Sequence, residues 1–170
     1  MTASDDDLRR LKAQISRRQR KADMASEQLA EINGELRLMF NHVFKDPARA
    51  RAQFEKDVRR KGVRGAVDLI YKEQRQIPSI GPYRSTTAGI SFRERTYKRE
   101  RTGRHLENLP SLYLKLESAW HQNEVAQRLL REAQQTADTA QAMKSAHKEL
   151  GLDRKRERRG GQDEEQGQFQ

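Results

Sequence analysis

Apolar residues recur at alternating steps of three and four along the first forty-three residues, and this repeat constrains the fold more than any other feature. Such spacing is the seam of a coiled coil, in which one stripe of a long helix packs against another helix. Asp5, Asp6 and Asp7 precede the stripe and favour the start of a helix. Arg18 is its one basic interruption. The seam consists of Leu8, Leu11, Ile15, Arg18, Ala22, Ala25, Leu29, Ile32, Leu36, Met39 and Val43.

A second repeat of the same kind occupies residues 112–140. Residues 108–110 (Asn-Leu-Pro) come before it and are typical of a helix entry, because proline suits the first helical position. Tyr113 and Trp120 are expected at the junction between this arm and the shorter helices. Two such arms predict one antiparallel pair, and therefore an all-α, elongated antiparallel helical bundle. The seam consists of Leu112, Leu116, Ala119, Asn123, Ala126, Leu130, Ala133, Ala137 and Ala140.

The segment between the arms predicts shorter elements. Asp46 followed by Pro47 is an N-cap with proline at the first helical position, so the chain turns there and a new helix begins. Two short amphipathic helices are expected to meet at Gly62. Residues 77–91 are rich in Pro, Gly, Ser and Thr, which indicates an ordered but irregular connection. Residues 91–105 then predict one more helix, which is strongly basic.

The composition limits the size of the hydrophobic core, and it also indicates the cellular compartment in which the protein resides. Only 34% of the 170 residues are hydrophobic and 35% are charged, which disfavours a large globular core. No apolar run approaches the roughly 20 residues of a membrane span, and the first residues lack the apolar stretch of a signal peptide. Cysteine is absent, which is compatible with a reducing interior. We therefore expect a cytoplasmic protein without a membrane span.

Three regions are predicted along the chain. Residues 1–7 form an acidic lead, and residues 8–150 form the helical bundle. Residues 151–170 contain too little apolar surface to order themselves, and their charge changes from basic to acidic along the segment. We expect this last region to be a disordered charged tail.

The sequence carries no recognisable pattern for catalysis or metal binding. Its four histidines, His42, His105, His121 and His147, are scattered and share no metal-ligand spacing. No GxSxG elbow and no GxxxxGK[ST] phosphate loop is present. We therefore predict a protein that is not an enzyme and has no catalytic residue, no cofactor, no metal and no small-molecule ligand.

The net charge of +10 points to an acidic partner, because a surplus of this size creates a positive field around the chain. Residues 55–104 hold fourteen Lys or Arg and six Asp or Glu, so most of the surplus lies there. These cations could be a solvated face over a small core, or a surface that binds a partner. The candidate partner-binding residues are Arg59, Arg60, Lys61, Arg64, Lys72, Arg84, Arg93, Arg95, Lys98, Arg99, Arg101 and Arg104.

Residues 36–130 resemble, in the order and spacing of their motifs, the BID (Bep intracellular delivery) domain of type IV secretion effectors and conjugative relaxases. Two departures stand out in the turn that follows Gly81: Tyr83 replaces the usual leucine, and Ser85 replaces the closing glycine. The residues that carry the resemblance are Val43, Phe44, Asp46, Pro47, Phe54, Gly65, Ala66, Ile70, Pro78 and Gly81.

The resemblance implies a translocation signal: an antiparallel four-helix bundle topped by a hook, recognised by the coupling protein of a type IV secretion system and carried into a recipient cell. It does not imply nicking of DNA, because the chain lacks the histidine cluster of a relaxase nicking domain. A free-standing module, the end of a split relaxase and an excised piece all remain open. So do two rival functions: a relaxosome accessory protein that binds DNA, and a coiled-coil scaffold whose basic face is only solvated.

Overall fold

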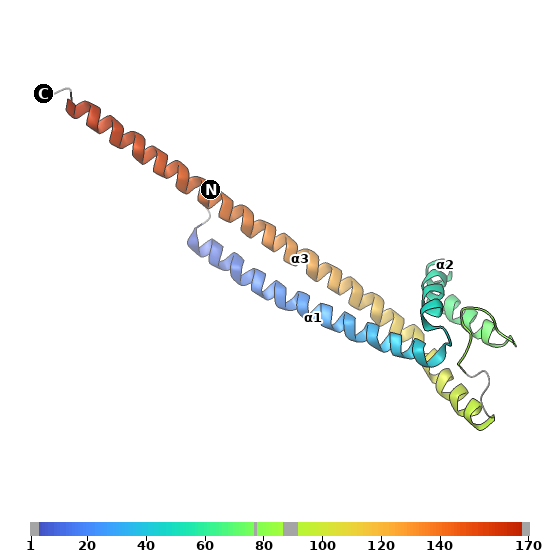
Figure 1. Ribbon diagram of the computed structural model, residues 1–170. Coiled ribbons are helices and arrows are strands. Elements are labelled where there is room, and N and C mark those ends of the chain that lie inside the picture. Colours follow the sequence, from blue (N-terminus) through green and yellow to red (C-terminus); the bar gives the residue numbers. More distant parts are fainter. Residues whose placement is uncertain (1–3, 77, 87–91, 168–170) are drawn as a thin grey trace. The chain divides into compact units, whose positions relative to one another are not determined.

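Three α-helices make up the fold in the part of the chain that the computed structural model describes, residues 4–76, 78–86 and 92–167. They are α1 (Asp5–Val43), α2 (Pro47–Gln74) and α3 (Phe92–Gly167) (Figure 1). Over these residues the extended structure is limited to one isolated bridge, which joins Phe44 to Ser85. The predicted all-α class is confirmed.

The helices contribute to two compact units. The first, which we term the arm unit, consists of residues 1–24 and 124–170, and the second, the junction unit, consists of residues 25–123. The arm unit is made from the beginning of α1 and the larger part of α3. The junction unit holds the end of α1, all of α2, the connection after it and the beginning of α3.

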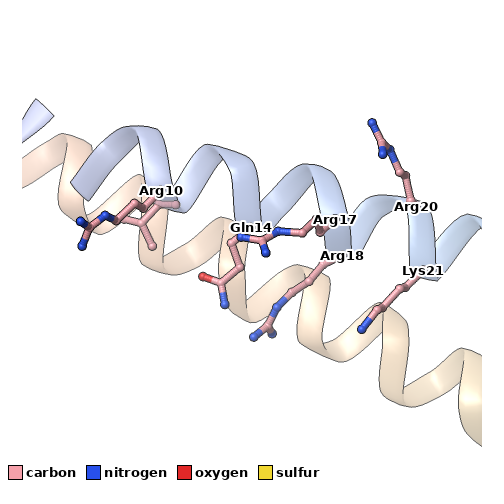
Figure 2. Close-up of a pocket in the computed structure, with 7 residues that line it drawn as sticks. Arg10, Gln14, Arg17, Arg18, Arg20 and Lys21 are labelled. Carbon is pink, nitrogen blue, oxygen red and sulfur yellow. The ribbon is translucent and has the colours of Figure 1, made fainter. Parts of the chain in front are cut away.

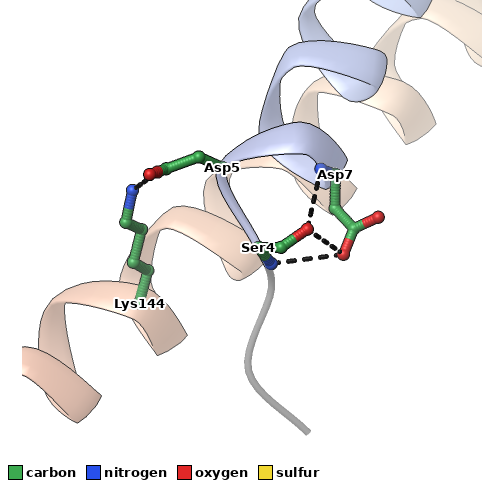
Figure 3. A network of polar contacts seen from close by, with 4 residues as sticks. All are labelled: Ser4, Asp5, Asp7 and Lys144. Atoms are coloured by element: carbon green, nitrogen blue, oxygen red, sulfur yellow. Dashed lines mark hydrogen bonds and ion pairs between the residues drawn. The ribbon is translucent and has the colours of Figure 1, made fainter.

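A capping box begins α1. The Ser4 hydroxyl accepts a hydrogen bond from the Asp7 amide at 3.2 Å, and the Ser4 amide donates to the Asp7 carboxylate at 3.2 Å (Figure 3). The two residues thus satisfy each other's backbone donors, as a helix N-terminus requires. The Ser4 hydroxyl also donates to the Asp7 carboxylate at 2.9 Å, and this bond, followed by the one from the Ser4 amide, holds the pKa of the Asp7 carboxyl below its usual range. The expected acidic lead is therefore helical from Asp5 onward.

The arm unit pairs α1 with α3 in antiparallel fashion. Asp5, at the start of α1, forms an ion pair with Lys144 (Figure 3). Further along α1, the Arg18 guanidinium donates to the Leu129 carbonyl at 2.9 Å. The residue number on α3 falls as that on α1 rises, which is the antiparallel direction. The apolar seam between the two helices is thin, and its buried members are Leu8, Ala22, Leu130 and Ala133.

The junction unit contains the main hydrophobic core, and Phe54 of α2 lies at its centre. The Phe54 ring meets Phe40 of α1 edge to face at a centroid distance of 5.7 Å and Tyr113 of α3 at 5.2 Å. Phe40 in turn packs against Phe44 at 5.1 Å. Such pairs contribute about 0.5–1.5 kcal/mol each beyond the area they bury. The rest of the buried core is Leu36, Met39, Val43, Ala50, Ala66, Val67, Ile70, Tyr83, Leu106 and Leu109.

Helix α2 begins and bends where the sequence predicts. The Asp46 side chain accepts from the Arg49 amide, and Pro47 follows it as the first helical residue. Gly62 has φ 77° and ψ 175°, outside the helical region, so α2 consists of two helical stretches joined by a kink. A positive φ costs roughly 1–2 kcal/mol for a residue with a Cβ, which explains glycine at this position.

The connection after α2 is held against the end of α1. The Lys45 amide donates to the Arg84 carbonyl at 2.9 Å, and the Thr86 amide donates to the Val43 carbonyl at 3.2 Å. The Thr86 hydroxyl adds a hydrogen bond to the His42 carbonyl at 3.1 Å. These bonds satisfy backbone groups that no helix supplies with partners. The expected ordered, irregular connection is confirmed over residues 78–86, and residues 77 and 87–91 lie outside the described part.

Helix α3 is continuous where a break was expected. The basic helix and the second arm, which the sequence separates at residues 108–110, form one helix with Pro110 in its interior. An interior proline costs about 3 kcal/mol, because it removes one backbone hydrogen bond and crowds the preceding turn. Leu106 and Leu109 are both buried in the core beside it. Burial of each contributes about 1.5–3 kcal/mol, which offsets the proline.

The end of α3 also differs from the expectation. The sequence predicts a disordered charged tail over residues 151–170, whereas α3 extends as a helix to Gly167. Residues 152–159 are mostly Arg, Lys, Glu and Leu, which are among the better helix formers. Apolar content, on which the prediction rested, measures whether a segment can bury a core and not whether its backbone can form a helix.

Truncation of Phe54 tests the core of the junction unit. We expect Phe54→Ala to lower the free energy of unfolding by about 3–5 kcal/mol, because a fully buried ring leaves a cavity between three helices. Chemical denaturation followed by circular dichroism measures the change. Leu38→Ala on exposed helix surface is the matched control and should change stability by less than about 0.5 kcal/mol. Equal effects of the two substitutions would contradict this core.

Candidate docking surface

Four cations surround the kink of α2. Arg59, Arg60 and Lys61 come directly before Gly62, and Arg64 follows two residues after it. All four side chains are exposed. Among the described residues, none of the four takes part in an ion pair. We term this group the kink cluster.

Three of the four carboxylates of α2 are engaged by other groups of the junction unit. Glu55 forms an ion pair with Arg51 one helical turn earlier, at 3.4 Å. Asp57 is buried and accepts from two side chains, and Glu73 accepts from Ser79 at 3.2 Å. Asp68 is the one exposed carboxylate of the helix. Three of its four acidic groups are therefore engaged by neighbouring groups, while the four cations of the kink cluster face solvent.

Asp57 and Tyr83 tie the connection to α2. The Tyr83 hydroxyl donates to the Asp57 carboxylate at 2.6 Å, and the Gln53 amide donates to the other carboxylate oxygen at 3.0 Å. Asp57 and Tyr83 are both buried, so the two hydrogen bonds replace the hydrogen bonds that water would donate to an exposed carboxylate. Burial, and then the hydrogen bond to Asp57, raise the pKa of the Tyr83 phenol far above its usual range.

Glu73 makes a second tie to the same connection. Burial raises the pKa of the Glu73 carboxyl, while its hydrogen bonds with the Ser79 hydroxyl and the Tyr83 backbone act in the opposite direction. Gly81 lies directly against this carboxylate, so a Cβ at residue 81 would require the end of the Glu73 side chain to move from its present position.

The other predicted cations divide into two groups. Lys72 on α2, Arg84 on the connection and Arg104 on α3 are exposed. The Arg84 carbonyl is held by the Lys45 amide, so the position of its backbone is fixed. The remaining cations belong to α3, but their side chains lie outside the described residues; they are Arg93, Arg95, Lys98, Arg99 and Arg101.

The residues that carry the family resemblance mostly build the junction unit. Asp46 and Pro47 begin α2, and Gly81 fits against Glu73, as described above. Gly65 is half-buried and Pro78 is exposed. The remaining motif residues are buried in the core; they are Val43, Phe44, Phe54, Ala66 and Ile70.

A shallow hollow beside α2 exposes the single tryptophan of the chain. The hollow has a volume of about 560 Å³, and it is lined by residues of α2 and α3. Tyr113 reaches the core from here, whereas Trp120 is 57% exposed. Trp120 thus lies at the junction, as expected, but most of its side chain is exposed. The lining residues are Arg51, Glu55, Tyr113, Leu116, Glu117, Trp120 and His121.

The histidines are less scattered than their spacing suggests. His42 of α1 and His105 of α3 stack with their rings 5.9 Å apart and 7° from parallel. Such a pairing between residues distant in sequence leaves no signal in their spacing. Throughout the described ranges, no group of three or more His, Cys, Asp or Glu side chains is placed to hold a metal ion. Within the same ranges, no helix combines the length and apolar character needed to cross a bilayer.

Comparisons with known proteins identify no relative. No protein-family model, no curated protein and no solved structure matches this chain.

Removal of the Tyr83 hydroxyl tests the tie between the connection and α2. Tyr83→Phe should lower the free energy of unfolding near neutral pH by about 1–3 kcal/mol, because the buried Asp57 loses a donor. Asp57→Asn in the Tyr83→Phe background should restore part of the lost free energy of unfolding. A neutral amide is less costly to bury without a hydrogen-bond donor than a charged carboxylate. Unchanged stability in Tyr83→Phe would contradict the buried bond.

The raised pKa of Tyr83 also sets a pH dependence. The folded state holds the phenol proton more tightly than the unfolded state, whose pKa lies near 10.0. The stabilisation is therefore complete below about pH 10 and is lost above it, by up to about 1.4 kcal/mol per pH unit. Denaturation of the wild type between about pH 8 and pH 11 should show this loss. Tyr83→Phe should show a shallower one, and an identical slope in both proteins would contradict the assignment.

The exposure of Trp120 predicts a small effect on stability. Trp120→Ala should change the free energy of unfolding by less than about 1 kcal/mol, because most of the ring already contacts water. Tyr113→Ala is the comparison: its ring packs on Phe54, so we expect a loss of about 2 kcal/mol or more. A larger loss for Trp120→Ala than for Tyr113→Ala would place the tryptophan in the core.

Proposed function

We propose that this chain is a non-catalytic translocation signal of a type IV secretion system, which docks its basic surface onto an acidic surface of the coupling protein. The activity is binding, and no bond is made or broken. The chain would be made in the cytoplasm of a bacterium and carried into a recipient cell. The family assignment and the identity of the partner rest on the resemblance of residues 36–130 to the BID domain.

The observation that carries the docking proposal is the kink cluster. Its cations are exposed, and the neighbouring carboxylates Glu55, Asp57 and Glu73 are engaged within the unit. A positive group without local neutralisation attracts an acidic partner over a distance of about one Debye length, roughly 8–10 Å in physiological salt. Charge complementarity of this kind increases the association rate and fixes the orientation of the partner.

The scaffold behind the cluster favours binding as well. Phe54 holds the first stretch of α2 to α1 and α3, and the bond between Asp57 and Tyr83 fixes the connection beside it. A surface that is already ordered loses little conformational entropy when it docks. The kink at Gly62 adds a fixed change of direction within the cluster.

The hollow at Trp120 supports the proposal because it adds an exposed apolar side chain to the basic surface. Exposed tryptophan and arginine are enriched among the residues that dominate the free energy of protein association. The hollow combines Trp120 with Arg51, and the electrostatic effect of Arg59 on the neighbouring Tyr113 indicates that the kink cluster begins close by. An apolar side chain of the coupling protein could bury Trp120 while its carboxylates meet the cations.

A transfer assay tests the proposal. The chain is fused to a reporter enzyme that is detectable only inside the recipient, in a donor that carries a type IV secretion system. We expect Arg60→Glu with Arg64→Glu to reduce transfer at least about tenfold, because two attractions become repulsions in the docked state. Equal amounts of each fusion in the donor are confirmed by immunoblot.

The matched control carries the same change in net charge elsewhere. Arg131→Glu with Lys148→Glu reverses two exposed cations of the arm unit, and this variant should transfer as well as the wild type. Normal transfer of the Arg60 and Arg64 variant would contradict docking through the kink cluster and would favour a scaffold with a solvated basic face. Absence of transfer by the wild-type fusion would contradict the proposed function itself.

A further inference from the structure

A second positive segment, free of acidic residues, lies outside the kink cluster at the beginning of α1. No acidic residue occurs between Asp7 and Asp23, and seven cations do. The sequence pattern singled out only Arg18, as an interruption of the apolar seam. The seven are Arg9, Arg10, Lys12, Arg17, Arg18, Arg20 and Lys21.

Part of this segment forms a continuous stripe on the surface of the arm unit. Arg10, Gln14, Arg17 and Lys21 are spaced by four, three and four residues, which places them on one face of a helix. With Leu11 and Arg18 they line a shallow hollow of about 540 Å³ (Figure 2). Arg20 also borders the hollow, but in Figure 2 its side chain points away from the others. We term Arg10, Gln14, Arg17 and Lys21 the arm stripe.

The arm stripe has little neutralisation from its surroundings. Among the described residues, none of its cations forms an ion pair. Asp5 is paired with Lys144, and Asp7 is taken up by the capping box with Ser4, although Arg10 also contributes to its lowered pKa. The facing part of α3, residues 124–149, holds four acidic and four basic side chains, so it adds no net negative charge.

The geometry of the stripe suits a regular row of anions. From Arg10 to Lys21 the helix rises by about 16 Å. Phosphates follow one another regularly along each strand of duplex DNA, and a stripe of this length spans more than one of them. Arginine also matches the geometry of a phosphate with paired hydrogen bonds.

Two other polyanionic partners fit less well. A helix that lies on a membrane needs a broad exposed apolar face, whereas the apolar seam of this segment packs against α3, with Leu8 and Ala22 buried and Leu11 and Ile15 half-buried. Single-stranded nucleic acid is bound by stacking bases on aromatic rings, yet residues 4–24 and 124–151 contain no Phe, Trp or Tyr. Duplex RNA is recognised across two successive minor grooves, which exceeds the reach of one stripe.

We propose that the arm stripe binds the phosphate backbone of duplex DNA without reading its sequence. Arg10, Arg17 and Lys21 contact phosphates of one strand, and Gln14 donates a hydrogen bond between them. Arg18 keeps its place on the Leu129 carbonyl and adds charge at the edge of the hollow. This inference is independent of the proposed function, because it concerns other residues and another unit.

The test measures binding of the full chain to a fluorescent duplex of about 30 base pairs with random sequence, by anisotropy, between about 50 and 200 mM NaCl. Arg17→Glu with Lys21→Glu is the stripe variant, and Arg37→Glu with Lys115→Glu, which reverses two exposed cations outside both proposed surfaces, is the control of equal net charge. Each phosphate contact contributes about 0.9 to the slope of log affinity against log salt, so the stripe variant should lose about 1.8 of that slope.

We expect the stripe variant to bind at least about tenfold more weakly than the control at low salt. The variant Arg17→Gln with Lys21→Gln, which removes charge without adding repulsion, should lie between wild type and stripe variant. Circular dichroism confirms that each variant is helical; if the Glu variant is not, the Gln variant decides, with at least about threefold weaker binding expected.

Several results would overturn the proposal. They are equal losses in stripe and control variants, no binding of the duplex by wild type at low salt, and tighter binding of single-stranded DNA or duplex RNA of the same length. Binding to anionic lipid vesicles without binding to the duplex would overturn it as well. The two proposals fail separately. The transfer assay measures the role of the kink cluster in secretion, whereas the anisotropy assay measures DNA binding by the arm stripe.

Discussion

The packing of Phe54 between the end of α1 and the beginning of α3 is the contact on which the junction unit depends. Only 34% of the residues are hydrophobic, so the chain concentrates its large apolar side chains in this one region. The arm unit, in contrast, buries few side chains, several of them alanines. A chain so rich in charge can hold a defined surface only beside such a core, because elsewhere little apolar burial opposes the loss of conformational entropy.

Once α2 is held in this way, its charges separate by sign. Asp57 accepts from Tyr83, Glu73 accepts from Ser79, and Glu55 pairs with Arg51, so these carboxylates contribute to folding. The cations that follow Asp57 in the sequence have no such partner among the described residues, and they face solvent. The cations of the proposed docking surface are thus exposed because these carboxylates form contacts elsewhere in the junction unit. A net charge of +10 alone does not indicate this arrangement.

Much of the fold could be predicted because its signals are local. The N-cap at Asp46, the kink at Gly62 and the long helical arms follow from residues a few positions apart. The errors concern features that depend on more distant residues or on a different physical quantity. Pro110 stays inside α3 because Leu106 and Leu109 are buried beside it.

The candidate site was predictable only in part for the same reason. The cations of the kink cluster can be counted in the sequence, but the inward use of Asp57 depends on Tyr83, twenty-six residues later. The arm stripe was not predicted, because the repeat in residues 8–43 is defined by its apolar positions and the stripe residues lie between them. Both surfaces follow from which neighbours engage each charge, and this information is three-dimensional.

The most direct test of the central claim is the affinity of the purified chain for the ATPase domain of a type IV coupling protein, measured against salt concentration. Trp120 is the only tryptophan of the chain and serves as an intrinsic probe when the tryptophans of the ATPase domain are replaced. A cationic docking surface predicts an affinity that falls steeply as salt rises, with a blue shift of the Trp120 emission on binding. Absence of binding at low salt, or binding that salt does not weaken, would contradict the account.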